Sequence, residues 1–589
     1  MTSLPVASPS PPRPLDIQIG RLMARLDRGR CPELEQAAVL VSQAAGQGHT
    51  CLPLELLAEQ LHAAAPMPAA RASVASLATS LAASHLVGGP DSARPLILDQ
   101  DRLYLLRLHR AETAIAADLR LRAAAMDRVD PKLVRPLLDQ LFPPDKTKRE
   151  DWQRAAAALA LHKRFVLLSG GPGTGKTYTA ARILSLFARL RPKQRRIALA
   201  APTGKAALRL QESLARAQTH PEPDDLALPE QAYTLHRLLG YSPASSRFRH
   251  NAEHQLALDL LIVDEASMID VPLMAALLAA LAPDCRLLLL GDRDQLASVE
   301  AGNLFADLCG RAAVGWSPEL TTALQPLLDF PLPPPVKAGP LADSLVVLRD
   351  SRRFAADSGI GALARAINTG SPETIDEALA LQAPDLSIRT VEPGDYQQCL
   401  APLLEDFFQP LKQAGSAREV LDQLERRRVL CALREGPSGV EGINRQAMAL
   451  LYGVSGERPC PGMPLMVVRN DYAQGLFNGD TGVFWPDAKG QLVAWFPGEH
   501  SDLIPVHPAR LPPWQTACAI TVHKAQGSEF DKVLLVLPPK ESQVLGRELL
   551  YTGITRARRH LTVFAPEALL RQAAARRQVR YTGLEQRLR

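Results

Sequence analysis

The chain has 589 residues, of which 46% are hydrophobic, so it is long enough for several domains with buried cores. A formal net charge of +5 permits a nucleic-acid partner but does not by itself argue for one. No apolar run approaches about 18 residues and no basic segment precedes an apolar stretch at the N-terminus, so we expect a soluble, cytoplasmic protein. The eight cysteines include no Cys-x-x-Cys pair, which argues against a zinc site and fits a reducing compartment.

The first quarter of the chain has no catalytic pattern. Residues 1–14 contain five prolines and are expected to be disordered. From residue 15 to about 141 the pattern is mostly helical, interrupted by short extended pieces at 96–98 and 103–106. A helical module without candidate catalytic residues is either a docking platform for a partner or a structural cap.

A glycine-rich loop at residues 169–177, Ser-Gly-Gly-Pro-Gly-Thr-Gly-Lys-Thr, follows an apolar strand pattern and precedes an amphipathic helix pattern. This order is the one that a phosphate-binding loop requires, because the glycines let successive N–H groups point at one anion. Lys176 can then reach the β- and γ-phosphates, and the Thr177 hydroxyl can ligate Mg²⁺. The alternative, a glycine-rich turn with a surface lysine, explains the flanking strand and helix less well.

Polar residues near this loop and at later strand ends complete the pattern of an ATPase. Gln153, just upstream, can pair with the edge of adenine, although it can also be a surface glutamine. An apolar strand pattern ends in Asp264 and Glu265, which can hold Mg²⁺ and activate a water, or simply cap a helix. Gln295 follows the next strand pattern and is suited to sensing the γ-phosphate.

Another strand end carries Thr203 and Lys205, which can hold a phosphodiester backbone or can belong to an ordinary turn.

After a proline-rich linker or surface loop at 325–340, a second α/β region begins. Arg353 and Arg556 in that region can reach across a cleft to the γ-phosphate, or can form surface salt bridges. Between residue 457 and about 513, short β patterns and turns predict a small inserted β-barrel.

The order of these motifs resembles superfamily 1 helicases. The matching elements run from Gln153 to the Thr-Arg-Ala string at 555–557. Longer strings resemble one branch, the superfamily 1B motor subunits of RecBCD-type helicase–nucleases (exonuclease V). These strings lie at 44–54, 101–105, 169–177, 234–240, 264–270, 291–302, 358–367, 430–436, 476–482 and 521–530.

The resemblance implies an α/β fold with two RecA-like P-loop domains of parallel sheets, an N-terminal helical domain and an inserted SH3-like β-barrel. The expected boundaries are 1–145 for the partner-docking domain, 146–345 for the first motor domain, 346–456 with 514–589 for the second, and 457–513 for the barrel. Residues 241–256 would form a pin-like insertion that separates strands, and Arg247, Arg249 and His250 make it basic.

The resemblance also implies a role for each matching residue. ATP would be bound by Gln153, Gly170, Gly171, Pro172, Gly173, Thr174, Gly175, Lys176, Thr177 and Glu529. Hydrolysis would depend on Lys176, Asp264, Glu265, Gln295, Arg353 and Arg556, with Mg²⁺ on Thr177 and Asp264. Single-stranded DNA would lie against Thr203, Lys205, Thr234, His236, His523 and Lys524.

The expected function is therefore an ATP-dependent 5′–3′ DNA helicase that acts in double-strand break repair by homologous recombination. Its partners would be DNA ends and RecB-like and RecC-like subunits in a heterotrimer, with the nuclease centre on a partner. Three alternatives remain: a stand-alone superfamily 1B helicase, a chain that is itself a nuclease, and a scaffold with a degenerate site.

Overall fold

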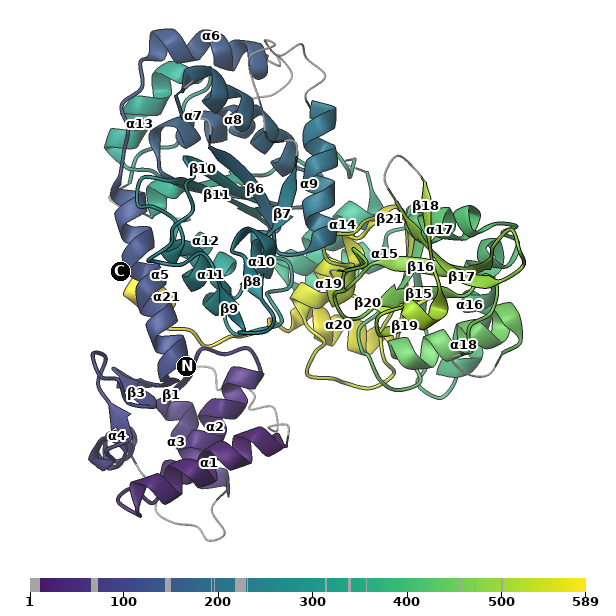
Figure 1. Ribbon diagram of the computed structural model, residues 1–589, viewed down its shortest axis with the longest axis horizontal. Coiled ribbons are helices and arrows are strands. Elements are labelled where there is room, and N and C mark those ends of the chain that lie inside the picture. Colours follow the sequence, from purple (N-terminus) through teal and green to yellow (C-terminus); the bar gives the residue numbers. More distant parts are fainter. Residues whose placement is uncertain are drawn as a thin grey trace.

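The computed structural model consists of an N-terminal module, a first lobe and a second lobe (Figure 1). It describes residues 11–588 except 65–72, 144–149, 192, 195, 218–228, 230, 313–314, 337–340, 356, 455–457, 472 and 499–501. Within these described residues no helix is long and apolar enough to cross a membrane. The expected disorder of residues 1–14 falls mostly outside the described residues, and the first helix begins at Pro14.

The N-terminal module packs helices against a small sheet with the strand order β1-β4-β3-β2. Its helices are α1 (Pro14–Asp27), α2 (Leu34–Gly46), α3 (Leu54–Ala64) and α4 (Val74–Ala83). Its strands are β1 (Cys51–Pro53), β2 (Val87–Gly88), β3 (Leu96–Asp99) and β4 (Arg102–Leu105). The two extended pieces expected from the sequence are therefore β3 and β4, which pair antiparallel. The long helix α5 (Leu106–Ala124) then joins the module to the first lobe.

The first lobe is built on a six-stranded parallel sheet in the order β12-β5-β11-β10-β6-β7. These strands are β5 (Phe165–Gly170), β6 (Ile197–Ala201), β7 (Ala232–Thr234), β10 (Leu260–Val263), β11 (Arg286–Gly291) and β12 (Leu345–Leu348). Strands β5, β10 and β11 are buried along their whole length, which explains their continuous apolar sequences. The surrounding helices are α6 (Pro131–Leu141), α7 (Trp152–His162), α8 (Lys176–Leu190), α9 (Gly204–Ala217), α10 (Leu235–Leu238), α11 (Val271–Ala279), α12 (Leu304–Ala312) and α13 (Pro318–Leu324).

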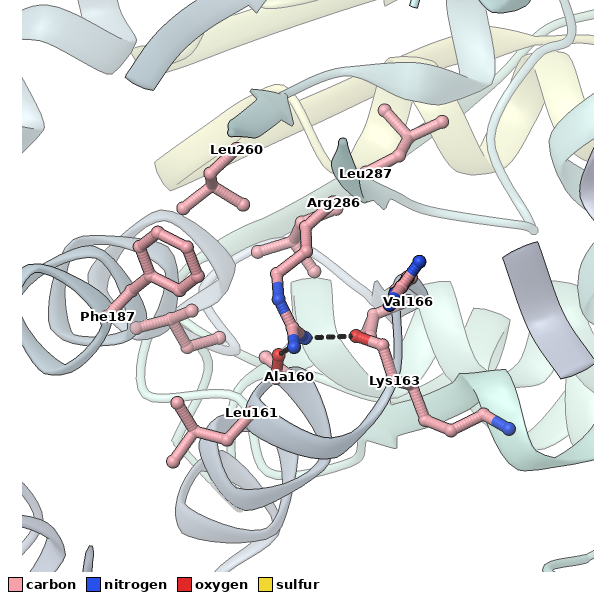
Figure 2. Close-up of a pocket in the computed structure, with 11 residues that line it drawn as sticks. Ala160, Leu161, Lys163, Val166, Phe187, Leu260, Arg286 and Leu287 are labelled. Atoms are coloured by element: carbon pink, nitrogen blue, oxygen red, sulfur yellow. Dashed lines mark hydrogen bonds between the residues drawn. The ribbon is translucent and has the colours of Figure 1, made fainter. Parts of the chain in front are cut away.

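A buried arginine holds together the edge of this sheet where its strands begin. Arg286, the first residue of β11, donates hydrogen bonds to the carbonyl oxygens of Ala160 at 2.9 Å and Lys163 at 2.7 Å (Figure 2). It also forms an ion pair with Asp127. The adjacent cavity of about 10 Å³ has room for about one water, so it is a packing defect and not a ligand site.

A two-stranded hairpin projects from the first lobe where the pin-like insertion is expected. It pairs β8 (Tyr241–Ser242) with β9 (Arg247–Phe248). The rings of Tyr241, Phe248 and His236 lie 5.5 to 5.8 Å apart, centre to centre, and together form the base of the hairpin.

The second lobe contains a five-stranded parallel sheet in the order β13-β22-β21-β14-β20. Its strands are β13 (Leu386–Thr390), β14 (Arg427–Cys431), β20 (Ala519–Thr521), β21 (Phe530–Val536) and β22 (Ala557–Ala565). Its helices are α14 (Gly359–Thr369), α15 (Pro372–Ala380), α16 (Tyr396–Lys412), α17 (Ala417–Arg426), α18 (Val440–Tyr452), α19 (Arg547–Ile554) and α20 (Glu567–Ala575). The last helix, α21 (Leu584–Arg587), lies outside this lobe, beside α5.

The expected inserted barrel is not confirmed. The β-rich segment forms an antiparallel sheet in the order β18-β17-β16-β15-β19, and within the described residues no pairing of β18 with β19 closes it. Its strands are β15 (Pro464–Val467), β16 (Thr481–Pro486), β17 (Leu492–Pro497), β18 (Leu503–Val506) and β19 (Trp514–Thr516). The physical reason is that residues such as Phe484 and Ala494 share one core with the second lobe, so the sheet buries its apolar face against α17 and its neighbours.

Candidate active site

The glycine-rich loop connects the end of β5 to the start of α8. Gly173 and Gly175 have φ angles of +78° and +86°, and Gly175 caps the helix. A Cβ atom at Gly173 would lie 2.4 Å from the Cβ of Arg353, and one at Gly175 would lie 2.4 Å from Nε2 of Gln153. Both positions therefore require glycine for backbone conformation and for close approach.

Lys176 and Thr177 stand at the N-terminus of α8. The ammonium of Lys176 donates to the carbonyl oxygens of Gly170 at 2.5 Å and Gly171 at 3.2 Å, so it bends back over the loop. The Thr177 hydroxyl donates to Oδ2 of Asp264 at 3.1 Å. The loop amides, the helix N-terminus and this ammonium together suit a polyphosphate. The two convergent oxygens of Thr177 and Asp264 are the hard ligands that Mg²⁺ prefers.

Asp264 and Glu265 follow β10, which lies between β6 and β11 in the sheet. Glu265 has a φ of +53°, a left-handed conformation that is uncommon for a residue other than glycine. Burial raises the pKa of Asp264, and burial together with the Asp264 charge raises the pKa of Glu265. A raised pKa makes Glu265 a better proton acceptor for an attacking water.

The arginines predicted to act from across a cleft lie in buried surroundings. Arg353 forms an ion pair with Glu529, and its backbone neighbour Arg352 donates its amide to the carbonyl of Gly173 at 2.9 Å. Arg556 is 3% exposed and donates to the carbonyl oxygens of Thr552 at 3.0 Å and Ser528 at 3.1 Å. Arg556 is therefore not a surface residue, whereas Arg353 is half-buried in a salt bridge with Glu529.

Glu529 carries the counter-charge for these arginines. Burial alone would raise its pKa, but Arg353, Arg556 and Arg209 outweigh burial and lower the pKa to about 2. The carboxylate is therefore ionised throughout the physiological range, and it places a fixed acceptor beside Arg353.

Gln153 lies against the loop, as its position in the sequence predicted. Its Nε2 donates to the carbonyl oxygen of Thr174 at 3.0 Å, and it is 9% exposed. The structure therefore joins the glutamine to the phosphate loop, and its recognition of adenine stays a prediction.

The residues predicted to contact DNA fall at two sheet edges. Ala201 pairs with Thr234, so the turns that carry Thr203 and His236 lie at the same edge of the first-lobe sheet. Both threonines accept amide hydrogens at helix starts, Thr203 from Ala206 and Thr234 from Arg237. In the second lobe, His523 and Lys524 form a 3-10 turn directly after β20. The Lys205 ammonium lies 5.9 Å from the ring centre of Phe530, so it reaches the second lobe.

Three residues missed by sequence reasoning bridge the two lobes. Asp292 accepts a hydrogen bond from Tyr551, and Thr552 accepts one from the amide of Leu296. Asp292 lies inside the string at 291–302, and Tyr551 and Thr552 lie just before the string at 555–557, but nothing local indicates that they meet.

Comparison with known proteins matches three family models to this chain. They are the N-terminal domain of "RecBCD enzyme subunit RecD" over residues 12–104, an AAA domain over 153–301 and a UvrD-like helicase C-terminal domain over 516–564.

Similar proteins match most of the chain. "RecBCD enzyme subunit RecD" of Mycolicibacterium smegmatis is 38% identical over 98% of this chain and 97% of its own length. The Haemophilus influenzae subunit of the same name is 36% identical over 76% of this chain and 73% of its length. "ATP-dependent RecD2 DNA helicase" of Deinococcus radiodurans is 32% identical over 83% of this chain but only 59% of its own length.

Proposed function

Because the chain belongs to the RecD family of RecBCD enzyme subunits, and is therefore an ATP-hydrolysing DNA helicase, we propose that it moves 5′ to 3′ along single-stranded DNA. In this proposal it is one motor of a heterotrimer with RecB-like and RecC-like subunits. The assembly would process DNA ends in the cytoplasm during recombinational repair of double-strand breaks. The nuclease centre would lie on a partner, since the sequence has no compact Asp, Glu and Lys cluster apart from the ATPase carboxylates.

One observation carries this proposal: the phosphate loop of the first lobe lies beside the half-buried Arg353, whose partner Glu529 also interacts with the buried Arg556. The amide of Arg352 contacts Gly173, and the side chain of Arg353 reaches Glu529 beside Arg556. ATP between the lobes would therefore meet Lys176 from one side and Arg353 and Arg556 from the other. Closure around ATP and opening after hydrolysis would move the DNA-facing turns of the two lobes relative to each other.

Each side chain then has a defined task. Lys176 would leave the Gly170 and Gly171 carbonyls for the β- and γ-phosphates, and Gln153 would read the adenine edge. Glu265 would take the proton of the attacking water, while Gln295, Arg353 and Arg556 would respond to the γ-phosphate. Thr177 and Asp264 would hold Mg²⁺, which supplies positive charge to the phosphate oxygens.

The domain division follows the same reasoning. We assign the N-terminal module within residues 1–145 to partner docking, 146–345 and 346–456 with 514–589 to the two motor domains, and 457–513 to the inserted open sheet. Strand β12 crosses the boundary at 345, although it pairs with β5, and β19 begins just past the boundary at 513, although it pairs with β15. The hairpin of β8 and β9 would separate the strands, with Arg247 and Arg249 facing DNA phosphates.

A stand-alone helicase is the second candidate. The match to the RecD N-terminal domain and the 97% coverage of the mycobacterial subunit, against 59% of the RecD2 helicase, favour the subunit. Isolation of the chain from its own cell separates the two candidates, because a subunit elutes with two larger partners and a stand-alone helicase elutes alone.

The substitution Lys176→Gln tests the ATPase site. It removes the charge that would neutralise the phosphates, so DNA-stimulated ATP hydrolysis by this chain should fall at least about 100-fold. Hydrolysis would be measured with the full chain in the assembly that it forms. Lys193→Gln, an exposed lysine just beyond α8, is the matched control and should retain full activity. Undiminished turnover in the Lys176 variant would refute the assignment.

A further inference from the structure

Asp292 is a buried carboxylate that joins the two lobes next to the ATPase site. It directly follows β11 and is 2% exposed. Its Oδ2 accepts hydrogen bonds from Nε2 of Gln295 at 3.1 Å and from the hydroxyl of Tyr551 at 3.1 Å. Gln295 belongs to the first lobe and Tyr551 to α19 of the second, so one oxygen atom connects them.

The same turn of α19 also reaches Arg556. The hydroxyl of Thr552 accepts the Leu296 amide at 2.9 Å, and the Thr552 carbonyl accepts Nε of Arg556 at 3.0 Å. The Leu296 side chain is 2% exposed and packs within the core of the second lobe. Figure 1 shows α19 on the side of the second lobe that faces the first. Gln295 in the first lobe and Arg556 in the second are thus linked through Asp292, Tyr551 and Thr552.

The side-chain amide of Gln295 uses its nitrogen in a hydrogen bond, whereas its oxygen is available to accept one. Its Nε2 is bound to Asp292, while its buried Oε1 has no hydrogen-bond partner within the described part of the chain. An unpartnered buried amide oxygen costs free energy, which a donor at that position would recover. The orientation that leaves this acceptor free depends on Asp292, because the carboxylate can only accept and so selects the NH₂ end.

We propose that Tyr551 is a positioning residue for ATP hydrolysis, holding Asp292 so that Asp292 presents the free oxygen of Gln295 to the attacking water, which donates a hydrogen bond to it. Gln295 is positioned in this way only when the second lobe is docked on the first, because Tyr551 comes from the second lobe. Burial, followed by the Asp292 charge, raises the pKa of Tyr551 well above its ordinary value, so its hydroxyl stays a donor. The inference deepens the function proposed above and rests on it.

The substitution Tyr551→Phe removes one hydroxyl and keeps the ring. The expected result is a fall of about tenfold in kcat for DNA-stimulated ATP hydrolysis, with KM for ATP changed less than twofold. Tyr396→Phe is the matched control, since Tyr396 is also a buried tyrosine of the second lobe whose hydroxyl donates one hydrogen bond, to the carbonyl of Leu537. That control should retain the wild-type kcat.

A double-variant experiment distinguishes a positioning role of Tyr551 from a purely structural contact. In a chain that already carries Gln295→Ala, Tyr551→Phe should cause no further loss of kcat, because its effect passes through Gln295. Asp292→Asn should likewise be non-additive with Tyr551→Phe. An equal loss in both backgrounds, or a wild-type kcat in the Tyr551 variant, would overturn the inference.

The assay uses the full chain in its native assembly, with the Lys176→Gln assembly as the blank for hydrolysis by other subunits. If Lys176→Gln abolishes the activity and Tyr551→Phe does not change it, only the positioning role fails. If Lys176→Gln has no effect, the proposed function itself fails.

Discussion

Lys205 shows how the surroundings of a single residue would adjust the DNA contact proposed for it. Much of its side chain is accessible to solvent, yet its ammonium lies beside Phe530, where the two lobes approach. Burial of the ammonium, followed by the charges of Arg428 and Arg209, lowers the pKa of Lys205 to about 7. The free protein therefore holds this lysine partly neutral at physiological pH.

This pKa predicts pH-dependent DNA binding. Lys205 is charged below pH 7 and neutral above it, and a bound phosphate would favour the charged form. Binding then takes up a proton above pH 7, so affinity for single-stranded DNA should fall roughly tenfold between pH 6.5 and 8.5. Titrations at constant ionic strength would measure this change.

Lys205→Arg is the control for that experiment, because a guanidinium stays charged across the whole range. Its affinity should vary much less with pH than the affinity of the wild type. Equal pH dependence in both proteins would show that another group is responsible.

At the scale of elements, the polar contacts of the first-lobe sheet differ between the carboxyl ends and the amino ends of its strands. At the edge where β5 and β10 end, polar turns form the site and leave donors and acceptors available to ligands. At the opposite edge, Arg286 satisfies the carbonyls of Ala160 and Lys163 and pairs with Asp127, so that β11 is joined to the end of α7 and the loop before β5.

The substitution Arg286→Met should therefore destabilise the first lobe. It leaves two carbonyls and the Asp127 carboxylate with fewer partners, at a cost of about 2–4 kcal/mol in the free energy of unfolding. Chemical denaturation followed by circular dichroism would measure the loss. Arg196→Met removes an exposed ion pair with Asp259 at the same edge of the sheet and should have no measurable effect. Equal stabilities for the two variants would contradict this account of the edge.

At the scale of the whole molecule, the chain end connects all three parts. After α20 the chain leaves the second lobe and runs back to α5, where α21 lies (Figure 1). The carbonyl of Tyr581 accepts the Thr50 amide at 2.9 Å, and Thr582 donates to Asp307 at 2.8 Å. Leu584 is fully buried in the first-lobe core, and Arg587 pairs with Asp99 at 2.6 Å. The N-terminal module is therefore held in place by a segment of the second lobe's own chain.

A chain truncated after Gln578 should lose this attachment. Removal of the segment also strips Glu112, a buried carboxylate, of the Gly583 amide and of Arg587. Hydrogen exchange at the Thr50 amide should become at least about tenfold faster, with faster proteolysis of the N-terminal module. Arg577→Ala, which changes an exposed side chain just before the segment, is the control. Unchanged protection of Thr50 would show that the module does not depend on the segment.

The strands and loops of the ATPase site could be predicted because their signals are local. The apolar runs that became β5, β10 and β11, and the glycine spacing before Lys176, reflect interactions between near neighbours in the chain. The short strand β7, Ala-Tyr-Thr, carries no such clear pattern, and the sequence did not indicate it. The roles of the site residues remain predictions that the variants above test.

The sequence by itself determined the order strand, loop, helix and carboxylate pair, because backbone geometry and side-chain periodicity act over a few residues. Only the tertiary structure decided which distant side chains meet. Asp292 and Tyr551 are separated by 259 positions, and Thr50 and Tyr581 by 531. It also decided that the inserted β-strands form an open sheet against the second lobe in place of a closed barrel. Contacts of this kind depend on how whole lobes bury their apolar faces, and no local pattern carries that information.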